Sequence, residues 1–274
     1  MPANEPATPA HAYHEYFGPA IFDPLATEVI ERARPRAGDR VLDLACGTGI
    51  VARRAAALAG PVGEVVGVDV NPAMLQIAHS LPVPEGARIE YREGDGTALD
   101  LPDDRFDLVY CQQGLQFFPD RASGAREMRR VLVDGGRAVV ATWKGLDRHP
   151  LYGALADAEE PHLSALGVAI TRDELVVPFS LGDPEQLKRL LADAGFADVD
   201  MAERSVEARF PSPDRFVERL ELAYAAVVPR FAQDPSAFRA YVADVTDDTR
   251  DVVERYRRGD HVVVPMHANI AVAS

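Results

Sequence analysis

The sequence has few cysteines and no long apolar run. Cys46 and Cys111 are the only cysteines among 274 residues, which is too few for a disulfide framework, and they lack the spacing of zinc ligands. We therefore expect no metal site and two small buried side chains. No apolar run reaches the roughly 18 residues that a membrane span needs, and residues 1–6 lack the basic and apolar regions of a signal peptide. These absences predict a cytoplasmic protein with no membrane partner.

An excess of basic residues is also absent. The chain has 43 acidic and 29 basic residues, a formal net charge of −14. A polyanion would be repelled before specific contacts formed, which argues against nucleic acid as a partner. With 47% apolar residues, the chain can bury one sizeable core and an appended cap.

Strand and helix patterns alternate in the first half of the chain. Apolar strands are predicted at 40–44, 64–69, 89–93, 106–111 and 137–142. Helices are predicted from the glycines at 47 and 49 to about 59, from the Asn71 cap to 80, and over 125–131. This alternation predicts a parallel sheet with helices on both faces.

The flanking segments have other patterns. Residues 1–10 are rich in proline and alanine and are predicted to be disordered, and a helical pattern follows over 12–30. Segments 146–177 and 211–258 are mostly helical and are expected to form a cap. Between and after them we predict a capping box at 183–186, a helix ending at Gly195, and strands at 198–209 and 261–273. Because the last two strands flank a helical insertion, the sheet is expected to end in an antiparallel pair.

The strongest local signal is Asp43-Leu44-Ala45-Cys46-Gly47-Thr48-Gly49, where the first strand becomes a helix. Its glycines let a ligand approach backbone N–H groups without an intervening side chain. The alternative is a plain turn in which Asp43 bonds loop amides. Asp69 ends the second strand 20 residues after Gly49, where carboxylates of doubly wound nucleotide sites accept hydrogen bonds from both ribose hydroxyls. Its alternative, capping the next helix, is a role that Asn71 already fills.

Three further residues are candidates for contacts with an adenine ring. Val70 and Met74 can pack on its face, although apolar residues near a helix start more often belong to the core. Asp95, in Gly94-Asp95-Gly96-Thr97, follows the third strand and can accept a hydrogen bond from the exocyclic amine. Taken alone, Asp95 is more often a turn residue.

An NAD-dependent oxidoreductase is an alternative, because residues 47–52 also satisfy the pattern G-x-G-x-x-A. Asp43 argues against it. A carboxylate beneath the loop would repel a pyrophosphate and instead suits an ammonium or sulfonium group.

Four segments resemble the successive motifs of class I S-adenosylmethionine-dependent methyltransferases, and within them the UbiE-like and antibiotic-tailoring branch: 43–49, 65–69, 94–97 and 106–120. The resemblance covers about 13–142. It implies a doubly wound, Rossmann-like α/β fold with seven strands in the order 3-2-1-4-5-7-6, strand 7 antiparallel, and helical cap or lid elements. The domains would be a tail with cap helices (1–39), the donor-binding core (40–145), and cap insertions with a C-terminal helix and strands 6 and 7 (146–274).

The resemblance also implies an activity and a set of donor contacts. S-adenosylmethionine would give its methyl group to oxygen, nitrogen or carbon of a small-molecule acceptor, a secondary metabolite or quinone-like compound, leaving S-adenosylhomocysteine. Ala45, Gly47 and Gly49 would hold the methionine part, Asp69 the ribose, and Asp95 with Gly96 the adenine. A donor-binding protein that does not methylate is the rival hypothesis, and a homodimer is compatible with either.

Residues 111–118 leave the fourth strand facing the donor's methyl group. We expect Gln112 to hydrogen-bond the methionine amine and Phe117 to lie against the sulfonium through a cation–π contact, with ordinary core as the alternative for the phenylalanine. No Asn/Asp-Pro-Pro-aromatic tetrapeptide follows this strand, which separates the chain from the amino-group methylases of DNA bases.

Positioning and a dry pocket supply much of the acceleration of an in-line methyl displacement, so a general base is optional. For a hydroxyl acceptor we predict His149 as the base, followed by Tyr13 or His14, against the alternative of a lone surface histidine. Segment 11–17 is a predicted lid, against the alternative of an ordinary first helix.

Overall fold

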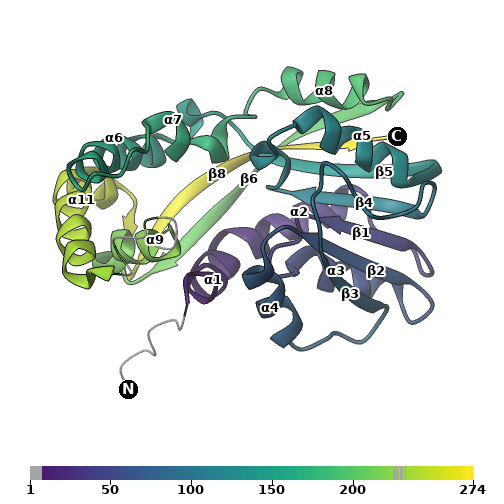
Figure 1. Ribbon diagram of the computed structural model, residues 1–274, viewed down its shortest axis with the longest axis horizontal. Coiled ribbons are helices and arrows are strands. Elements are labelled where there is room, and N and C mark those ends of the chain that lie inside the picture. The colour runs from purple at the N-terminus through teal and green to yellow at the C-terminus, as the bar shows by residue number, and fades with distance from the viewer. Residues whose placement is uncertain (1–7, 225–227, 229–230, 232) are drawn as a thin grey trace. The chain divides into compact units, whose positions relative to one another are not determined.

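The computed structural model describes residues 8–224, 228, 231 and 233–274, and it is a mixed α/β structure (Figure 1). The chain divides into two units. The core unit comprises Asp23–Gly145, Pro178–Ser205 and His267–Ser274. The helical unit comprises Met1–Phe22, Leu146–Val177 and Val206–Met266. The predicted domain boundaries at residues 39 and 145 stay predictions.

The eight strands that the structure describes form one sheet, in the order β3-β2-β1-β4-β5-β8-β6, with the short β7 paired to β8. The strands are β1 (Arg40–Leu44), β2 (Glu64–Asp69), β3 (Arg88–Glu93), β4 (Phe106–Gln112), β5 (Leu132–Trp143), β6 (Val199–Pro211), β7 (Arg257–Arg258) and β8 (His261–Ala273). The first five are parallel, and β8 is antiparallel to β5. The predicted strand order is confirmed. Residues 257–258, predicted to end a helical segment, instead form a hairpin with β8 through Gly259, whose φ is +63°.

The parallel register brings the carboxyl ends of four strands to one edge of the sheet. Leu44 at the end of β1 is paired with Val68, and Asp69 at the end of β2 is paired with Glu93. The loops that follow these strands therefore emerge side by side, as they do at the ligand-binding edge of doubly wound folds.

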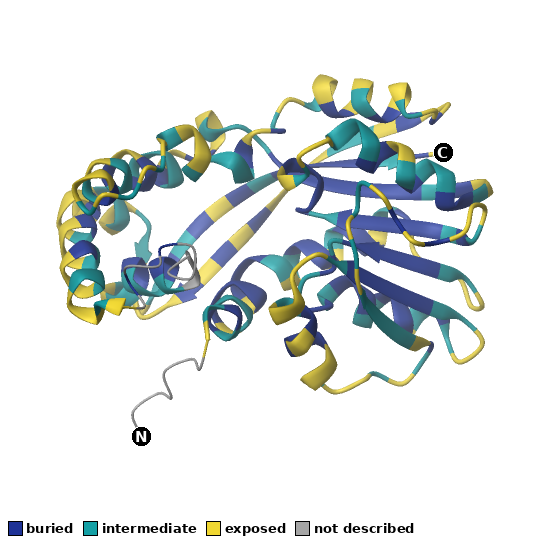
Figure 2. Cartoon of the chain, viewed as in Figure 1, coloured by how far each residue is buried: buried dark blue, intermediate teal, exposed yellow. Residues whose placement is uncertain are grey.

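Helices cover both faces of the core unit's sheet. Leu42, Met128 and Leu187 belong to one buried cluster, so α5 (Arg121–Val131) and α8 (Pro184–Asp193) cover that face. Asp43 points to the opposite face because strand side chains alternate. There its carboxylate meets the start of α3 (Ile50–Ala59), which packs beside α2 (Asp23–Arg32). Figure 2 shows the central strands buried along nearly their whole length.

Several element boundaries differ from the predictions. Helix α5 begins at Arg121, four residues earlier than predicted, because Asp120 caps it through the backbone N–H of Ser123. Strand β5 begins at Leu132, five residues before the predicted start at residue 137. Asp183 caps α8 by accepting from Glu185 N rather than through the predicted capping box. Two further helices of this unit are η2 (Leu115–Phe117) and α4 (Pro72–Ser80), and α4 has the predicted Asn71 cap.

The N-terminal segment is helical from Pro9 onward. The segment predicted to be disordered is residues 1–10, and residues 1–7 lie outside the described residues. Pro9 and Ala10 open the helix α1 (Pro9–Ala12), so for these two residues the prediction was wrong. A π-helix, η1 (Tyr13–Phe22), follows and contains Pro19, a residue without an N–H to donate.

The helical unit has its own packed aromatic cluster. Tyr16 and Phe17 of η1 contact Phe210 of β6, which in turn contacts Phe216 with ring centroids 5.2 Å apart. The other helical elements described for this unit are η3 (Leu146–Arg148), α6 (Pro150–Ala165), α7 (Arg172–Leu175), η5 (Pro213–Arg215), α9 (Phe216–Tyr224) and α11 (Pro235–Arg255). The short helix η4 (Val177–Phe179) has its first residue in this unit. His162 of α6 lies 2.8 Å from Asp248 of α11, joining these two helices. Of the helices that the structure describes, none combines the length and apolar character needed to cross a membrane.

Candidate functional site

The loop that follows β1 is a tight, left-handed turn. Ala45, Gly47 and Gly49 have φ values of +56°, +53° and +75°. The turn is anchored to β2, because Cys46 N donates to the carbonyl of Val68 at 3.0 Å. Gly49 then caps α3. The predicted glycine loop therefore lies at the carboxyl edge, with backbone N–H groups at the start of a helix.

Asp43 lies beneath this loop and is 1% exposed. Its Oδ2 accepts a hydrogen bond from Ala52 N, at 2.8 Å, in the first turn of α3. Burial raises the pKa of Asp43 to about 7, and the nearby carboxylate of Asp69 adds to the increase. The contact with Ala52 is the amide-bonding role considered as the alternative, and attraction of a cationic donor stays a prediction.

Asp43 is expected to make folding stability fall as pH rises. Its pKa is about 7 in the folded chain, above the ordinary value of 3.8, so the folded state binds more protons between these pH values and stability falls across that window. Asp43→Asn keeps an acceptor for Ala52 without the charge. Denaturant titrations at pH 5 and pH 8 should show the variant gaining stability relative to the wild type at the higher pH. An unchanged difference between the two proteins would contradict this assignment.

Asp69 joins the loop after β1 to the end of β2. Its Oδ2 accepts from Gly47 N at 2.7 Å and its Oδ1 accepts from Asn71 N at 2.8 Å. Burial raises the pKa of Asp69, and these backbone donors partly offset the increase. Asn71 caps α4 through Ala73 N. The structure thus places Asp69 directly beside Gly47. The predicted contact of Asp69 with the ribose stays a prediction.

Val70 and Met74 follow at the same edge. Val70 is 71% exposed and Met74 is half-buried. A large apolar side chain so exposed at the end of a buried strand is available to pack against a flat ligand, and the predicted adenine contact of Val70 is compatible with this position.

The loop after β3 joins the same group. Gly94 N donates to the carbonyl of Asp69 at 3.0 Å. Asp95 accepts hydrogen bonds from the backbone N–H and the hydroxyl of Thr97, which lower its pKa. It is therefore a turn residue here, exposed at the predicted adenine position. A Cβ atom on Gly96 would lie 2.5 Å from Cζ of Phe118, so this glycine leaves room for a neighbouring ring.

The loop after β4 closes the edge. A Cβ atom on Gly114 would lie 2.5 Å from Cβ of Ala45, so the loops after β1 and β4 are in contact. Gln112 ends β4, half-buried and in register with Ala141. Phe117 is 54% exposed, a position that leaves its ring accessible to a ligand.

Gln113 has a structural role that the sequence did not indicate. Its φ is +55°, and its Oε1 accepts from Trp143 N at 3.1 Å and from Gln116 Nε2 at 2.7 Å. The side chain thereby bonds a backbone N–H at the end of β5. Residue type gave no signal for this role, which depends on the unusual backbone conformation.

The three predicted catalytic residues lie in the helical unit. His149 is 1% exposed at the start of α6, where Tyr152 N donates to its carbonyl at 3.0 Å. It is therefore not the surface histidine of the alternative. Tyr13 and His14 lie in η1, half-buried, and Tyr13 stacks on Phe22 with ring centroids 5.1 Å apart. Their catalytic roles stay predictions.

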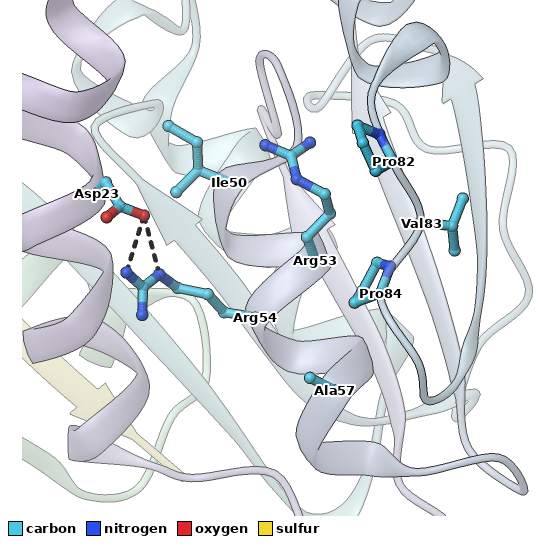
Figure 3. Close-up of a pocket in the computed structure, with 8 residues that line it drawn as sticks. All are labelled: Asp23, Ile50, Arg53, Arg54, Ala57, Pro82, Val83 and Pro84. Carbon is cyan, nitrogen blue, oxygen red and sulfur yellow. Dashed lines mark hydrogen bonds and ion pairs between the residues drawn. The ribbon is translucent and has the colours of Figure 1, made fainter.

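A separate cavity of about 390 Å³ lies along α3 (Figure 3). It is lined by Asp23, Ile50, Arg53, Arg54, Ala57, Pro82, Val83 and Pro84. Arg54 is ion-paired with Asp23 at 2.8 Å across one side. The predicted donor-binding residues are not among the eight that line it.

Comparisons with known proteins agree with this layout. Residues 41–136 match the family model described as a methyltransferase domain. The ubiquinone/menaquinone biosynthesis C-methyltransferase UbiE of Ectopseudomonas mendocina (strain ymp) is 34% identical over 179 residues, 62% of this chain and 70% of that protein.

Solved structures share the fold. A putative methyltransferase from Bacillus halodurans has a TM-score of 0.59 at 17% identity, covering 90% of this chain and 97% of that one. Phosphoethanolamine N-methyltransferase 2 of Haemonchus contortus, solved with S-adenosyl-L-methionine, has a TM-score of 0.56 at 19% identity, covering 96% and 56% of the two chains. None of these three relatives is named as an NAD-dependent oxidoreductase, the alternative considered from the sequence.

Proposed function

The chain belongs to the class I S-adenosylmethionine-dependent methyltransferases, in the UbiE-like group, and we propose that its acceptor is a small aromatic molecule of the hydroquinone type. The observation that carries the proposal is the 34% identity to a ubiquinone/menaquinone C-methyltransferase across 70% of its length. The exposed ring of Phe117 supports it, because an aromatic face suits a flat acceptor and this residue follows Gly114, which contacts the loop after β1.

The residues at the carboxyl edge fit S-adenosylmethionine. A Cβ atom on Gly47 would meet nothing within 4 Å, so the space over this part of the loop is open. The Asp69 carboxylate accepts backbone hydrogen bonds from Gly47 and Asn71, and because a carboxylate has about four lone-pair sites, it retains capacity for a ribose hydroxyl. When bound, S-adenosylmethionine supplies a methyl group on a positively charged sulfur, and Asp43 places a buried carboxylate beneath the loop that would hold it.

For acceptor activation we assign the proton-accepting role first to His149, and next to Tyr13 or His14. A hydroquinone becomes more nucleophilic at its ring carbon when a hydroxyl proton is withdrawn, so a general base would accelerate the reaction. His149→Ala should then lower the rate with a hydroquinone while leaving S-adenosylhomocysteine affinity unchanged.

The acceptor class is tested with deuteromethyl-labelled S-adenosylmethionine and four acceptors: a substituted hydroquinone, a catechol, a primary amine and a DNA oligonucleotide. We expect labelled methyl on a ring carbon of the hydroquinone, located by NMR, with an equimolar amount of S-adenosylhomocysteine. Methylation of the amine or the oligonucleotide alone would overturn the acceptor class. Donor binding with no transfer to any acceptor would favour the rival, a donor-binding protein that does not methylate.

A further inference from the structure

Tyr91 of β3 lies over Gly67, its partner in the parallel register with β2. A Cβ atom on Gly67 would lie 2.6 Å from Cδ1 of Tyr91 and 3.0 Å from Sγ of Cys46. Real Cβ atoms do not approach so closely, so the ring occupies the space that a side chain at position 67 would need. Tyr91 thereby extends across β2 toward the loop that follows β1.

The far end of the same ring reaches Gly49. A Cβ atom on Gly49 would overlap the Tyr91 hydroxyl and lie 2.7 Å from Cζ and 2.9 Å from Cε1. Gly47 differs: it is partly exposed, and a Cβ atom there would meet nothing within 4 Å. The space over Gly47 is open to a ligand, whereas the space beside Gly49 is filled by Tyr91.

Other contacts fix the two ends of this arrangement. On the loop side, Arg53 Nη1 donates to the carbonyl of Thr48 at 2.6 Å, the residue between the two glycines. On the other side, the imidazole of His79 in α4 meets the Tyr91 ring edge-on, with centroids 5.3 Å apart. The tyrosine is therefore held between α4 and the loop.

We propose that Tyr91 is a positioning residue for donor binding, because its ring braces Gly49 in the left-handed conformation that starts α3 and so sets the position of Gly47. The inference rests on the proposed donor site. The proposal also changes the role of Gly49. Position 49 lacks a side chain because Tyr91 fills the space there, whereas position 47 lacks one because the ligand needs the space over it.

A double-mutant cycle tests the proposal by calorimetric titration with S-adenosylhomocysteine. Gly49→Ala places a methyl group against the ring and should weaken binding at least about tenfold, while Tyr91→Leu removes Cζ, Cε1 and the hydroxyl. The Gly49→Ala/Tyr91→Leu protein should therefore bind more tightly than Gly49→Ala alone. Additive losses in the double variant would overturn the proposal.

Controls separate positioning from stability. Gly135→Ala, at a residue with φ of +74° and open surroundings, introduces the same backbone strain away from the loop and should leave affinity unchanged. Tyr91→Phe keeps the ring and should bind S-adenosylhomocysteine within about threefold of the wild type. Tyr91→Leu should bind it more weakly, at a temperature where melting curves show both variants folded.

If Gly49→Ala fails to fold, the comparison of Tyr91→Phe with Tyr91→Leu decides, and equal affinities of these two variants overturn the proposal. If the wild type fails to bind, the donor site itself is wrong; if it binds and the cycle is additive, only the role of Tyr91 falls.

Discussion

Gly47→Val is expected to reduce S-adenosylhomocysteine affinity at least about a hundredfold while the protein remains folded. The two methyl groups of valine would occupy the open space over the loop, where a Cβ atom on this glycine would meet nothing within 4 Å. The φ of +53° adds a strain of roughly 1–3 kcal/mol for a residue other than glycine. Ala45 shows that the loop already accommodates a side chain in this conformation, at φ +56°.

Gly135→Val is the matched control for this strain. Gly135 has φ +74° and equally open surroundings, and it lies near the start of β5, at the opposite edge of the sheet. The melting temperatures of both variants should fall by similar amounts, and only Gly47→Val should lose affinity for S-adenosylhomocysteine. If Gly47→Val bound S-adenosylhomocysteine like the control, the methionine part would not lie over this glycine.

Asp69→Ala is expected to weaken donor binding by about 1.5–3 kcal/mol, the range for hydrogen bonds to a charged group, or roughly 10- to 150-fold. Two losses combine, because the carboxylate both faces the predicted ribose position and accepts a hydrogen bond from Gly47 N. Titration of the folded variant with S-adenosylhomocysteine measures the sum, and Asp69→Asn, which keeps one acceptor oxygen, should lie between.

Asp95→Ala serves as the comparison for Asp69. Asp95 also accepts two local hydrogen bonds, but its partners belong to Thr97 in its own turn and its side chain is exposed. A solvent-exposed contact contributes less, so its loss should cost under about tenfold. An unchanged affinity for Asp69→Ala would remove Asp69 from the site.

The arrangement of the carboxyl edge could be predicted from the sequence because its signals are local. The acid at position 69, the glycines at 47 and 49, and the Asn71 cap each stand next to a strand end that periodicity locates. Parallel pairing then brings those ends together without further information. The hydrogen bond from Gly47 N to Asp69 is the direct result.

What each glycine makes room for could not be predicted. Gly49 accommodates Tyr91, and Gly96 accommodates Phe118, each from a different strand or loop. These contacts join residues far apart in the sequence, and a missing side chain has the same appearance in the sequence whether a ring or a ligand fills the space. Gln113 escaped notice for a similar reason, since its role depends on a left-handed backbone that glutamine rarely adopts.

The predicted ends of helices and strands were wrong where a helix cap or a pairing strand determines the end. The pattern of apolar residues placed the start of α5 at residue 125, but the Asp120 cap extends the helix back to Arg121. The pairing of Arg257 with Val262 likewise turns the end of a predicted helical segment into a strand. Both depend on local hydrogen-bonded contacts rather than on periodicity.

A crystal structure of the protein with S-adenosylhomocysteine bound tests the central claim most directly. We predict the ribose hydroxyls within hydrogen-bond distance of the Asp69 carboxylate, the methionine part over Gly47, and the sulfur facing Phe117. S-adenosylhomocysteine in the cavity along α3, among Arg53 and Pro82, or with its ribose away from Asp69, would contradict it.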